Sequence, residues 1–292
     1  MTPHFDYSEA FSRNIGWITV DEQKTLRKKR IAIAGMGGVG GVHLLTLVRL
    51  GIGAFNISDL DQFELVNFNR QSGAMMSTLG RSKAETLAQM ALDINPDLDI
   101  RVFSEGISLA NVREFLSDAD LYVDGMDFFA FKIREALFSS SYDMGIHAIT
   151  AAPLGMGSAL LNFKPGGITF EEYFDWEGLS EEEMAIHYLI GISPGMLQFP
   201  YLVDQKAVNL SEKKGPSTAM ACQLCAGMLA TEALKVILNR GKVLVAPWGM
   251  QFDAYRNRFV KTWRPGGNRN PIQRLLIKIA KSRLEKMKNN QG

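Results

Sequence analysis

Short apolar runs and amphipathic segments alternate along the first half of the chain. RIAIAG at 30–35 is an apolar run of strand length, and GVHLLTLVRLGIG at 41–53 repeats its apolar residues at helical spacing. A chain that alternates strands with helices in this way forms a mostly parallel sheet with helices on both faces. We therefore expect an α/β fold with a doubly wound sheet. The pattern predicts strands at 30–35, 54–61, 99–106, 120–127 and 146–155 and helices at 41–53, 80–96, 108–119 and 128–145.

The alternation stops after residue 155. An antiparallel extension of the sheet is predicted from residues 156–167 and from two alternating runs in 242–265. A long helix is predicted between them, at 217–241. Residues 165–216 show no clear period and are rich in proline and glycine. A segment of this length without secondary structure of its own is more often functional than a linker. We therefore predict a long loop that covers the site.

The chain divides into a helical lead-in at 1–29, a main domain at 30–263 and a basic tail at 264–292. The tail carries eight lysines and arginines against one glutamate, whereas the whole chain has a net charge of +1. This charge separation indicates a distinct role for the tail. Within 268–292 an amphipathic helix is predicted, which suits packing on the protein or a partner subunit, an anionic membrane surface, or tRNA. Its apolar face consists of Ile272, Leu275, Leu276, Ile279 and Leu284.

Composition narrows the class of protein. A hydrophobic content of 46% and a charged content of 22% are ordinary for a water-soluble domain. No uncharged apolar run approaches the roughly 18 residues that a membrane-spanning helix requires. The first residues also lack the basic-then-apolar order of a secretory signal. Two cysteines in 292 residues exclude a disulfide framework and suit a reducing compartment, so we expect a cytoplasmic protein.

A glycine-rich turn follows the first predicted strand. In IAIAGMGGVGG, backbone N–H groups lie between a strand and a helix, where they and the helix N-terminus attract phosphate. Asp59 ends the second strand, at the place where a carboxylate binds ribose hydroxyls in nucleotide-binding sheets. These residues suit a dinucleotide and ATP equally well, so a dehydrogenase is one interpretation and an ATP-dependent enzyme is the other. The glycines of the turn are Gly35, Gly37, Gly38 and Gly40.

Cationic residues near the turn favour ATP. The stretch DLDQFELVNFNRQ adds Asp61, Asn67 and Arg70 after the ribose position, and GRSKAE adds Lys83. A dinucleotide needs little cationic help from side chains, whereas a triphosphate carries more charge and requires it. Asp127 ends another predicted strand at the same edge of the sheet, where a carboxylate would hold the Mg²⁺ of Mg-ATP.

The order and spacing of these motifs resemble the adenylating domain of the ubiquitin-activating superfamily, of the ThiF, MoeB and HesA type. The resemblance extends over roughly residues 10–260 and rests on the glycine turn, Asp59, the NFNRQ run at 67–71, Lys83 and Asp127. It implies a Rossmann-like fold, a homodimer, and a reaction in which a carboxylate attacks ATP and pyrophosphate leaves. The carboxylate would belong to the C-terminal glycine of a ubiquitin-like or sulfur-carrier protein.

The resemblance also implies a role for each matched residue. The four glycines would cradle ATP, and Asp59 would bind its ribose with Asp61 beside it. Asn67, Arg70 and Lys83 would contact the phosphates, and Asp127 would hold the metal. Arg13, in the lead-in sequence Ser-Arg-Asn, would reach from one subunit into the site of the other. The residues expected to serve catalysis are therefore Arg13, Arg70, Lys83 and Asp127.

Most of these residues also have a purely structural explanation. The glycines could serve close packing of a helix on the sheet, and Arg70 could form a surface ion pair of little energetic value. Lys83 could lie on the solvated face of a helix. Asp127 could cap the helix that follows it. A non-catalytic adaptor that binds a nucleotide without turnover is therefore an alternative function.

Two departures from the family pattern shape the functional prediction. Many relatives carry two CxxC pairs that bind zinc, but this chain has one, Cys222 and Cys225, inside a predicted helix. One pair cannot complete a four-ligand site, so we expect no zinc. No cysteine occurs in 165–216, where relatives that form an enzyme thioester carry theirs, so we expect an outside nucleophile to finish the reaction. A zinc-less branch that activates a carboxylate on a modified tRNA base is a further alternative.

Overall fold

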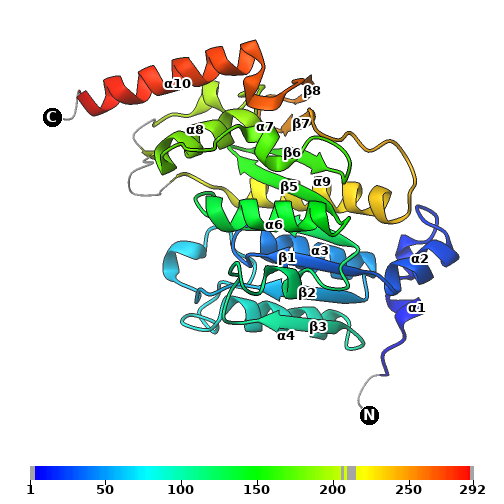
Figure 1. The fold of residues 1–292 in the computed structure, drawn as a ribbon. Coiled ribbons are helices and arrows are strands. Elements are labelled where there is room, and N and C mark those ends of the chain that lie inside the picture. Colours follow the sequence, from blue (N-terminus) through cyan, green and yellow to red (C-terminus); the bar gives the residue numbers. More distant parts are fainter. Residues whose placement is uncertain (1–3, 205–206, 209–214, 290–292) are drawn as a thin grey trace.

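An eight-stranded sheet runs through the computed structural model, which describes residues 4–204, 207–208 and 215–289 (Figure 1). Its strands are β1 (Arg30–Ala34), β2 (Ala54–Ser58), β3 (Asp99–Phe103), β4 (Leu121–Asp124), β5 (His147–Leu154), β6 (Gly157–Phe163), β7 (Trp248–Asp253) and β8 (Arg258–Trp263). They lie in the order β3-β2-β1-β4-β5-β6-β7-β8. The strands from β3 to β5 are parallel to their neighbours, and β6, β7 and β8 are added antiparallel. The structure thus confirms a mostly parallel sheet with an antiparallel extension.

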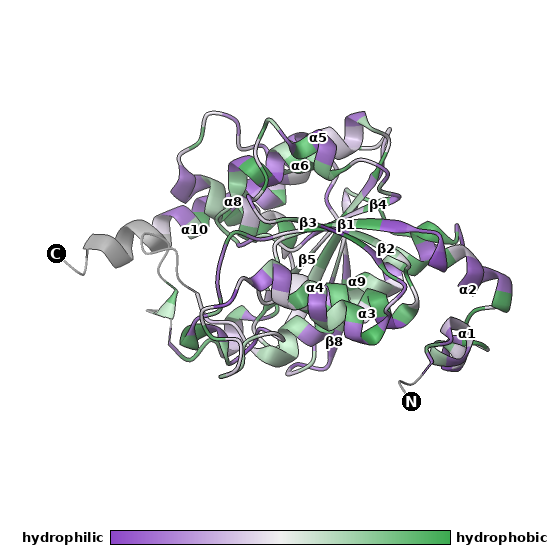
Figure 2. Cartoon of the chain, turned by 90° about the horizontal axis from the view of Figure 1, so that it is seen from below, coloured by the Kyte–Doolittle hydropathy of each residue, from purple (hydrophilic) through white to green (hydrophobic). Residues whose placement is uncertain are grey.

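Helices cover both faces of the sheet (Figure 2). One face carries α3 (Gly40–Leu50), α4 (Lys83–Ile94) and α9 (Ala219–Ile237), and the other carries α5 (Val112–Phe115), α6 (Phe131–Asp143) and α8 (Glu181–Ile192). The short helix α7 (Phe170–Phe174) packs against α6 and α8. An apolar core lies on each side of the sheet. Within β1, Ile31 and Ile33 belong to the first core, and Ala32 and Ala34 belong to the second. Strands buried on both faces are typical of parallel sheets between two helical layers.

The lead-in folds against the far end of α3. It comprises α1 (Tyr7–Ala10), a 3₁₀ turn η1 (Ser12–Asn14) and α2 (Val20–Arg27). The Tyr7 hydroxyl donates to the Gly51 carbonyl oxygen, and Asn14 Nδ2 donates to the Leu50 carbonyl oxygen at 3.2 Å. These bonds satisfy carbonyl groups that the C-terminus of a helix leaves open. They attach the lead-in to the amino edge of the sheet, opposite the glycine turn.

The segment 165–216 differs from the predicted long loop. Its described part contains α7, α8 and a 3₁₀ turn, η3 (Phe199–Tyr201). Capping boxes begin both helices, Thr169 with Glu172 and Ser180 with Glu183. These S/T-x-x-E signals are visible in the sequence and promote helix formation even in a segment without clear period. The segment is a packed helical layer because its aromatic side chains enter the second core: Phe170, Tyr173, Phe174 and Trp176.

By length and composition alone, α9 could cross a membrane. In the structure α9 packs on β5, β6 and α3. Its Glu232 is buried and accepts a hydrogen bond from Nδ2 of Asn162 on β6 at 3.1 Å. We therefore identify α9 as a core helix of the first layer.

The tail forms a 3₁₀ turn, η5 (Gly267–Arg269), and the helix α10 (Pro271–Asn289), which packs on α8. Its buried face differs from the predicted one. Gln273 faces inward because its Nε2 donates to the Ile190 carbonyl oxygen at 3.0 Å, a contact that the apolar pattern does not signal. Leu284, which was predicted on the same face, lies outside the described side chains. Three residues of the predicted apolar face are exposed: Ile272, Leu275 and Ile279.

Candidate active site

The loops after β1 and β4 meet at the carboxyl edge of the sheet. These strands are neighbours, with β2 on one side of the pair and β5 on the other. The Gly125 amide donates to the Ala34 carbonyl oxygen at 2.8 Å, and a Cβ on Gly35 would collide with the Gly125 backbone. Open α/β sheets bind ligands where the strand order reverses. The geometry therefore places the candidate site at these two loops.

The four glycines of the turn serve two purposes. Gly35 has a φ of +87°, and a Cβ on Gly35 or Gly40 would collide with backbone, so both are required for close packing. A Cβ on Gly37 or Gly38 would meet only side-chain atoms, at 3.3 Å or more. Packing therefore explains Gly35 and Gly40 but not the other two. Gly37 and Gly38 leave the backbone at the start of α3 open to a phosphate group.

Arg70 lies over the open part of the turn. Its Nε is 3.5 Å from the position that a Cβ on Gly38 would take. Its Nη1 donates to the Val66 carbonyl oxygen at 3.1 Å and to Asn69 Oδ1 at 2.9 Å. Among the residues that the structure describes, no carboxylate forms an ion pair with Arg70. The guanidinium charge therefore remains available to an anion at the turn.

Asn67 and Asn69 form hydrogen bonds that hold the loop around Arg70. Asn67 is buried, and its Oδ1 accepts a hydrogen bond from the Glu64 amide at 3.0 Å across η2 (Leu65–Asn67). Asn69 Nδ2 donates to the Ser217 carbonyl oxygen at 2.9 Å and so connects this loop to the start of α9. Gln71 Oε1 is buried and has no hydrogen-bond partner among the described residues. The hydrogen bonds of Asn67 and Asn69 therefore fix the loop that carries Arg70.

Asp59, Asp61 and Lys83 form one connected group beside the turn. Asp59 Oδ2 accepts from the Met36 amide at 2.6 Å, and its Oδ1 accepts from the Asp61 amide at 2.8 Å. Burial raises the pKa of the Asp59 carboxyl, and the two backbone donors oppose that rise. Lys83 Nζ lies 2.8 Å from Asp61 Oδ2. Lys83 is only 6% exposed, so it does not lie on a solvated helix face.

The strand predicted to end at Asp127 ends at Asp124. Asp127 lies three residues further on, is exposed, and its Oδ2 accepts from the Phe129 amide at 3.0 Å. The structure therefore gives Asp127 a place in the turn before α6, and its metal role stays a prediction. The described residues contain no group of three or more metal-ligating side chains. One exposed carboxylate still fits Mg²⁺, because this ion takes most of its ligands from water and phosphate oxygens when it accompanies ATP.

Sequence reasoning missed a buried ion pair beneath this turn. Asp124 Oδ2 lies 2.9 Å from Arg134 Nε, and both side chains are at most 2% exposed. Burial opposes the charge on Arg134, but Asp124, Tyr188 and Tyr122 together exceed this effect, so the pKa of the guanidinium is raised. Arg134 Nη2 also donates to the Met126 and Asp127 carbonyl oxygens, at 3.0 and 2.7 Å. Arg134 therefore holds the turn that carries Asp127. An arginine among the apolar residues of FFAFKIREALF was the available signal.

The helical layer over the site contacts the same ion pair. The ring of Tyr188 on α8 lies 4.7 Å from Arg134 Cζ. Thr150 Oγ1 donates to Asp124 Oδ2 at 2.8 Å and lies 3.2 Å from the Tyr188 hydroxyl. Burial raises the pKa of Tyr188 to about 12, so the phenol stays protonated at neutral pH. These contacts connect α8 to the turn that carries Asp127.

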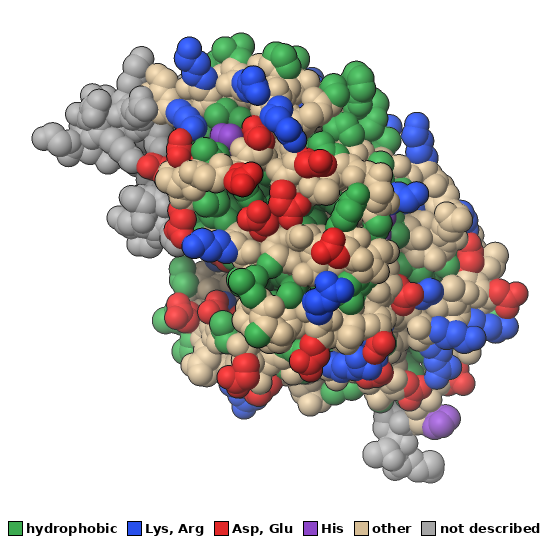
Figure 3. Space-filling model, viewed as in Figure 1, with side chains coloured by type: hydrophobic (Ala, Val, Ile, Leu, Met, Phe, Trp, Pro, Cys, Tyr) green, Lys and Arg blue, Asp and Glu red, His purple; other side chains and the backbone are tan. Residues whose placement is uncertain are grey.

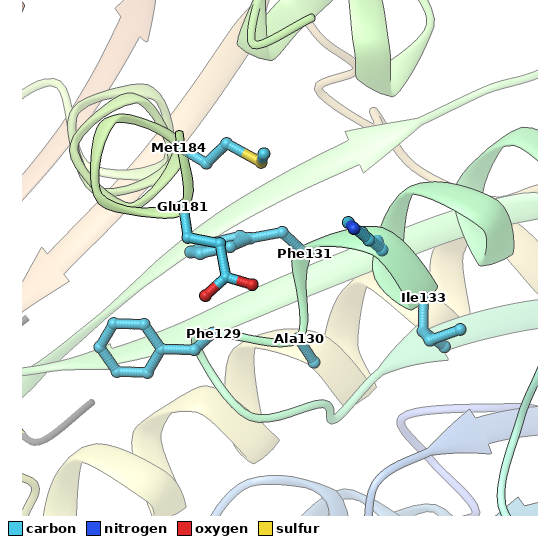
Figure 4. Close-up of a pocket in the computed structure, with 7 residues that line it drawn as sticks. Phe129, Ala130, Phe131, Ile133, Glu181 and Met184 are labelled. Atoms are coloured by element: carbon cyan, nitrogen blue, oxygen red, sulfur yellow. The ribbon is translucent and has the colours of Figure 1, made fainter. Parts of the chain in front are cut away.

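A cavity of about 140 Å³ opens between the start of α6 and α8 (Figure 4). Phe129, Phe131 and Met184 line it, together with Glu181. In Figure 4, Glu181 and Met184 of α8 face the loop that contains Phe129 and Ala130. Nucleotide and cofactor sites usually exceed roughly 300 Å³. This cavity therefore suits a single apolar group, and the nucleotide is expected at the glycine turn.

Arg13 does not join the site of its own chain. It is exposed in η1, and the lead-in is bound to the C-terminal end of α3 through Asn14. The glycine turn lies at the opposite end of this 11-residue helix, a separation of about 16 Å at 1.5 Å per residue. The side chain of Arg13 cannot span that distance. Its role at the glycine turn of another copy of the chain stays a prediction.

The two cysteines are both buried in α9. Burial raises the pKa of the Cys222 thiol, although Ser217 and Arg70 act in the opposite direction. Burial also raises the pKa of Cys225. Both are therefore thiols rather than thiolates at neutral pH, and thiols are poor metal ligands and nucleophiles. The absence of zinc stays a prediction.

Comparison with known proteins identifies relatives of the chain. The chain is 26% identical over 227 residues to the probable adenylyltransferase/sulfurtransferase MoeZ of Mycobacterium tuberculosis, covering 77% of this chain and 52% of that protein. It is 32% identical over 123 residues to the tRNA threonylcarbamoyladenosine dehydratase of Haemophilus influenzae, covering 42% of this chain and 47% of that protein. The chain thus spans about half the length of the curated relatives it matches.

A solved structure shares the fold. The crystal structure of E. coli MccB with ATP aligns at a TM-score of 0.67 and 18% identity, covering 89% of this chain and 71% of that chain. At this identity the likeness shows the fold alone. The match to the ThiF family extends over residues 11–274, which include the glycine turn, the Arg70 loop and the turn that carries Asp127. The chain therefore belongs to the ThiF family.

Proposed function

We propose that this chain is an ATP-dependent adenylyltransferase that activates a carboxylate and releases pyrophosphate. The observation that carries the proposal is the position of Arg70, beside the open glycines of the turn and without an ion-pair partner among the described residues. The turn and the helix N-terminus suffice for a dinucleotide, whereas a triphosphate requires further cations. Lys83, which pairs with Asp61 and acts on Asp59 electrostatically, would supply a second cation. The similarity to MoeZ, named as an adenylyltransferase, supports the proposal.

In the proposed reaction a carboxylate oxygen attacks the α-phosphorus of ATP. The new oxygen–phosphorus bond forms as the bond to pyrophosphate breaks, so the products are an acyl-adenylate and pyrophosphate. The protein forms no covalent bond and contributes alignment and charge neutralisation. Arg70, Lys83 and Asn67 would bind the phosphates, and Asp59, with Asp61 beside it, would bind the ribose. Mg²⁺ held by Asp127 would neutralise charge on the leaving pyrophosphate.

We propose the C-terminal glycine of a ubiquitin-like or sulfur-carrier protein as the carboxylate, and an outside nucleophile as the final acceptor. A second candidate is a carboxylate on a modified tRNA base. The identity of 32% to a tRNA dehydratase favours this candidate, and so does the basic tail, because clustered cations attract nucleic acid. Both candidates share the adenylation step.

Two measurements test the proposed activity. Calorimetric titration should show binding of Mg-ATP and no binding of NADH. Incubation with ATP, labelled pyrophosphate and a candidate carboxylate should return label to ATP, because adenylation is reversible. Tight NADH binding without Mg-ATP binding would assign the chain to the dehydrogenases. Binding of Mg-ATP without exchange for either substrate class would assign it to the nucleotide-binding adaptors.

We also propose that the protein is a homodimer in which Arg13 completes the partner's site. Large apolar side chains are exposed both beside Arg13, at Ile15 and Trp17, and beside Arg70, at Leu65 and Val66. A two-fold contact that joined these two patches would bury both and bring Arg13 of one copy to Arg70 of the other. Exposed apolar patches of this kind mark interaction surfaces.

Mixing two inactive variants tests this arrangement. Arg13→Ala inactivates the site of the partner subunit, and Lys83→Ala inactivates the site of its own subunit. A mixed dimer therefore contains one intact site, on the Arg13→Ala subunit. After subunit exchange, an equal mixture should recover about a quarter of native exchange activity, because half of the dimers are mixed. A mixture of Lys83→Ala with Arg70→Ala is the matched control, because both changes affect the same site and no intact site can form. Full activity of a strictly monomeric protein would contradict the proposal.

A further inference from the structure

The helix α10 presents a second apolar face to solvent. Its inner face packs through Ile277 on Ile186 and Ile190 of α8. On the outer face Ile272, Leu275 and Ile279 are 54%, 59% and 42% exposed. These three residues are spaced by three and four positions, so they form one stripe along the helix. The inner face accounts for the attachment of α10 to the body and leaves the stripe unexplained.

Cations border the stripe. Arg274 and Lys278 are exposed within the same turns of α10. Neither forms an ion pair with a described residue, in contrast to Lys281, whose Nζ lies 2.6 Å from Glu183 Oε1. Figure 3 shows Lys and Arg side chains gathered along the end of the molecule where α10 lies. The surface therefore combines aliphatic side chains with cations that form no ion pair with a described carboxylate.

We infer that the outer face of α10 docks on an anionic membrane surface. An amphipathic helix with cations beside an aliphatic stripe inserts the stripe at the headgroup boundary, while the cations attract anionic lipids. RNA would use Arg274 and Lys278 but would leave the stripe in water. A two-fold contact with a second copy would bring these cations against their own counterparts. An anionic bilayer satisfies both features of the face, and the inference is independent of the proposed activity.

Co-sedimentation of the full chain with lipid vesicles tests the inference. Vesicles of equal parts phosphatidylcholine and phosphatidylglycerol should bind the native protein, and vesicles of phosphatidylcholine alone should bind it weakly. Leu275→Gln with Ile279→Gln should weaken binding to the anionic vesicles about tenfold or more, because the inserted apolar area is lost. Arg274→Gln with Lys278→Gln should weaken it to a similar extent, and added salt should weaken native binding.

The control variants carry the same types of substitution at exposed positions outside α10. Leu109 and Val203 are exposed apolar residues outside α10, so Leu109→Gln with Val203→Gln should leave vesicle binding unchanged. Arg113→Gln with Lys242→Gln is the matched control for charge, because both residues are exposed. All four variants change exposed side chains and should fold. Equal vesicle binding by the native protein and both α10 variants would overturn the inference. So would binding of tRNA that depends on Arg274 and Lys278 without vesicle binding, or a dimer that dissociates in the Leu275 and Ile279 variant.

Discussion

Asp127→Asn should bind Mg-ATP nearly as well as the native protein and lose pyrophosphate exchange by at least ~10²-fold, the scale of one electrostatic contact in a transition state. The asparagine keeps the oxygen that accepts from the Phe129 amide, so the turn before α6 is retained. It removes the negative charge that would hold Mg²⁺ beside the leaving pyrophosphate. Calorimetry with Mg-ATP and the exchange assay measure the two halves of this expectation.

The thermal unfolding midpoint of Asp127→Asn should equal that of the native protein, which separates a catalytic effect from a structural one. Asp118→Asn is the matched control, because Asp118 is an exposed carboxylate outside the site that pairs with Arg101. The control should keep full exchange activity. If Asp127→Asn also exchanged at the native rate, the residue would serve only the turn, and the metal role would be wrong.

Arg134→Met should lower the free energy of unfolding by about 3–5 kcal/mol, because it leaves the buried Asp124 carboxylate without its partner. It should also abolish pyrophosphate exchange, because Arg134 binds the carbonyl oxygens of the turn that carries Asp127. Urea denaturation measures the first effect. The double variant Asp124→Leu with Arg134→Met should recover part of the lost stability, since no charge then remains buried.

Arg101→Met is the matched control for the buried pair. Arg101 and Asp118 also lie 2.9 Å apart, but their side chains are 43% and 68% exposed. Loss of an exposed pair costs at most about 1 kcal/mol. Equal unfolding free energies for Arg134→Met and Arg101→Met would show that the buried pair does not stabilise the turn. Arg134→Lys keeps the charge but not the forked donors, so it should be more stable than Arg134→Met and still impaired in exchange.

Local patterns in the sequence were sufficient to predict the sheet, the glycine turn and the helices on both faces other than α7 and α8. Strand and helix periods are properties of neighbouring residues, so RIAIAG and GVHLLTLVRLGIG predict β1 and α3 without knowledge of the rest. The strand order then places the carboxyl ends of β1 and β4 together. The proximity of Arg70 to Gly38 was predictable in outline, because both follow strands that end at this edge.

Only the tertiary structure decided which polar residues pair and which faces are buried. Asp124 and Arg134 become partners because α6 folds back over β4, and this contact buries Arg134 beneath the turn while Asp127 stays exposed. On α10, Gln273 faces inward because it donates to the Ile190 carbonyl oxygen. Leu275 is exposed, although the apolar pattern predicted it on the buried face. The residues around a polar side chain do not reveal a hydrogen-bond partner that a distant segment supplies. The hydrophobic period of a strand or helix, in contrast, can be read from consecutive residues.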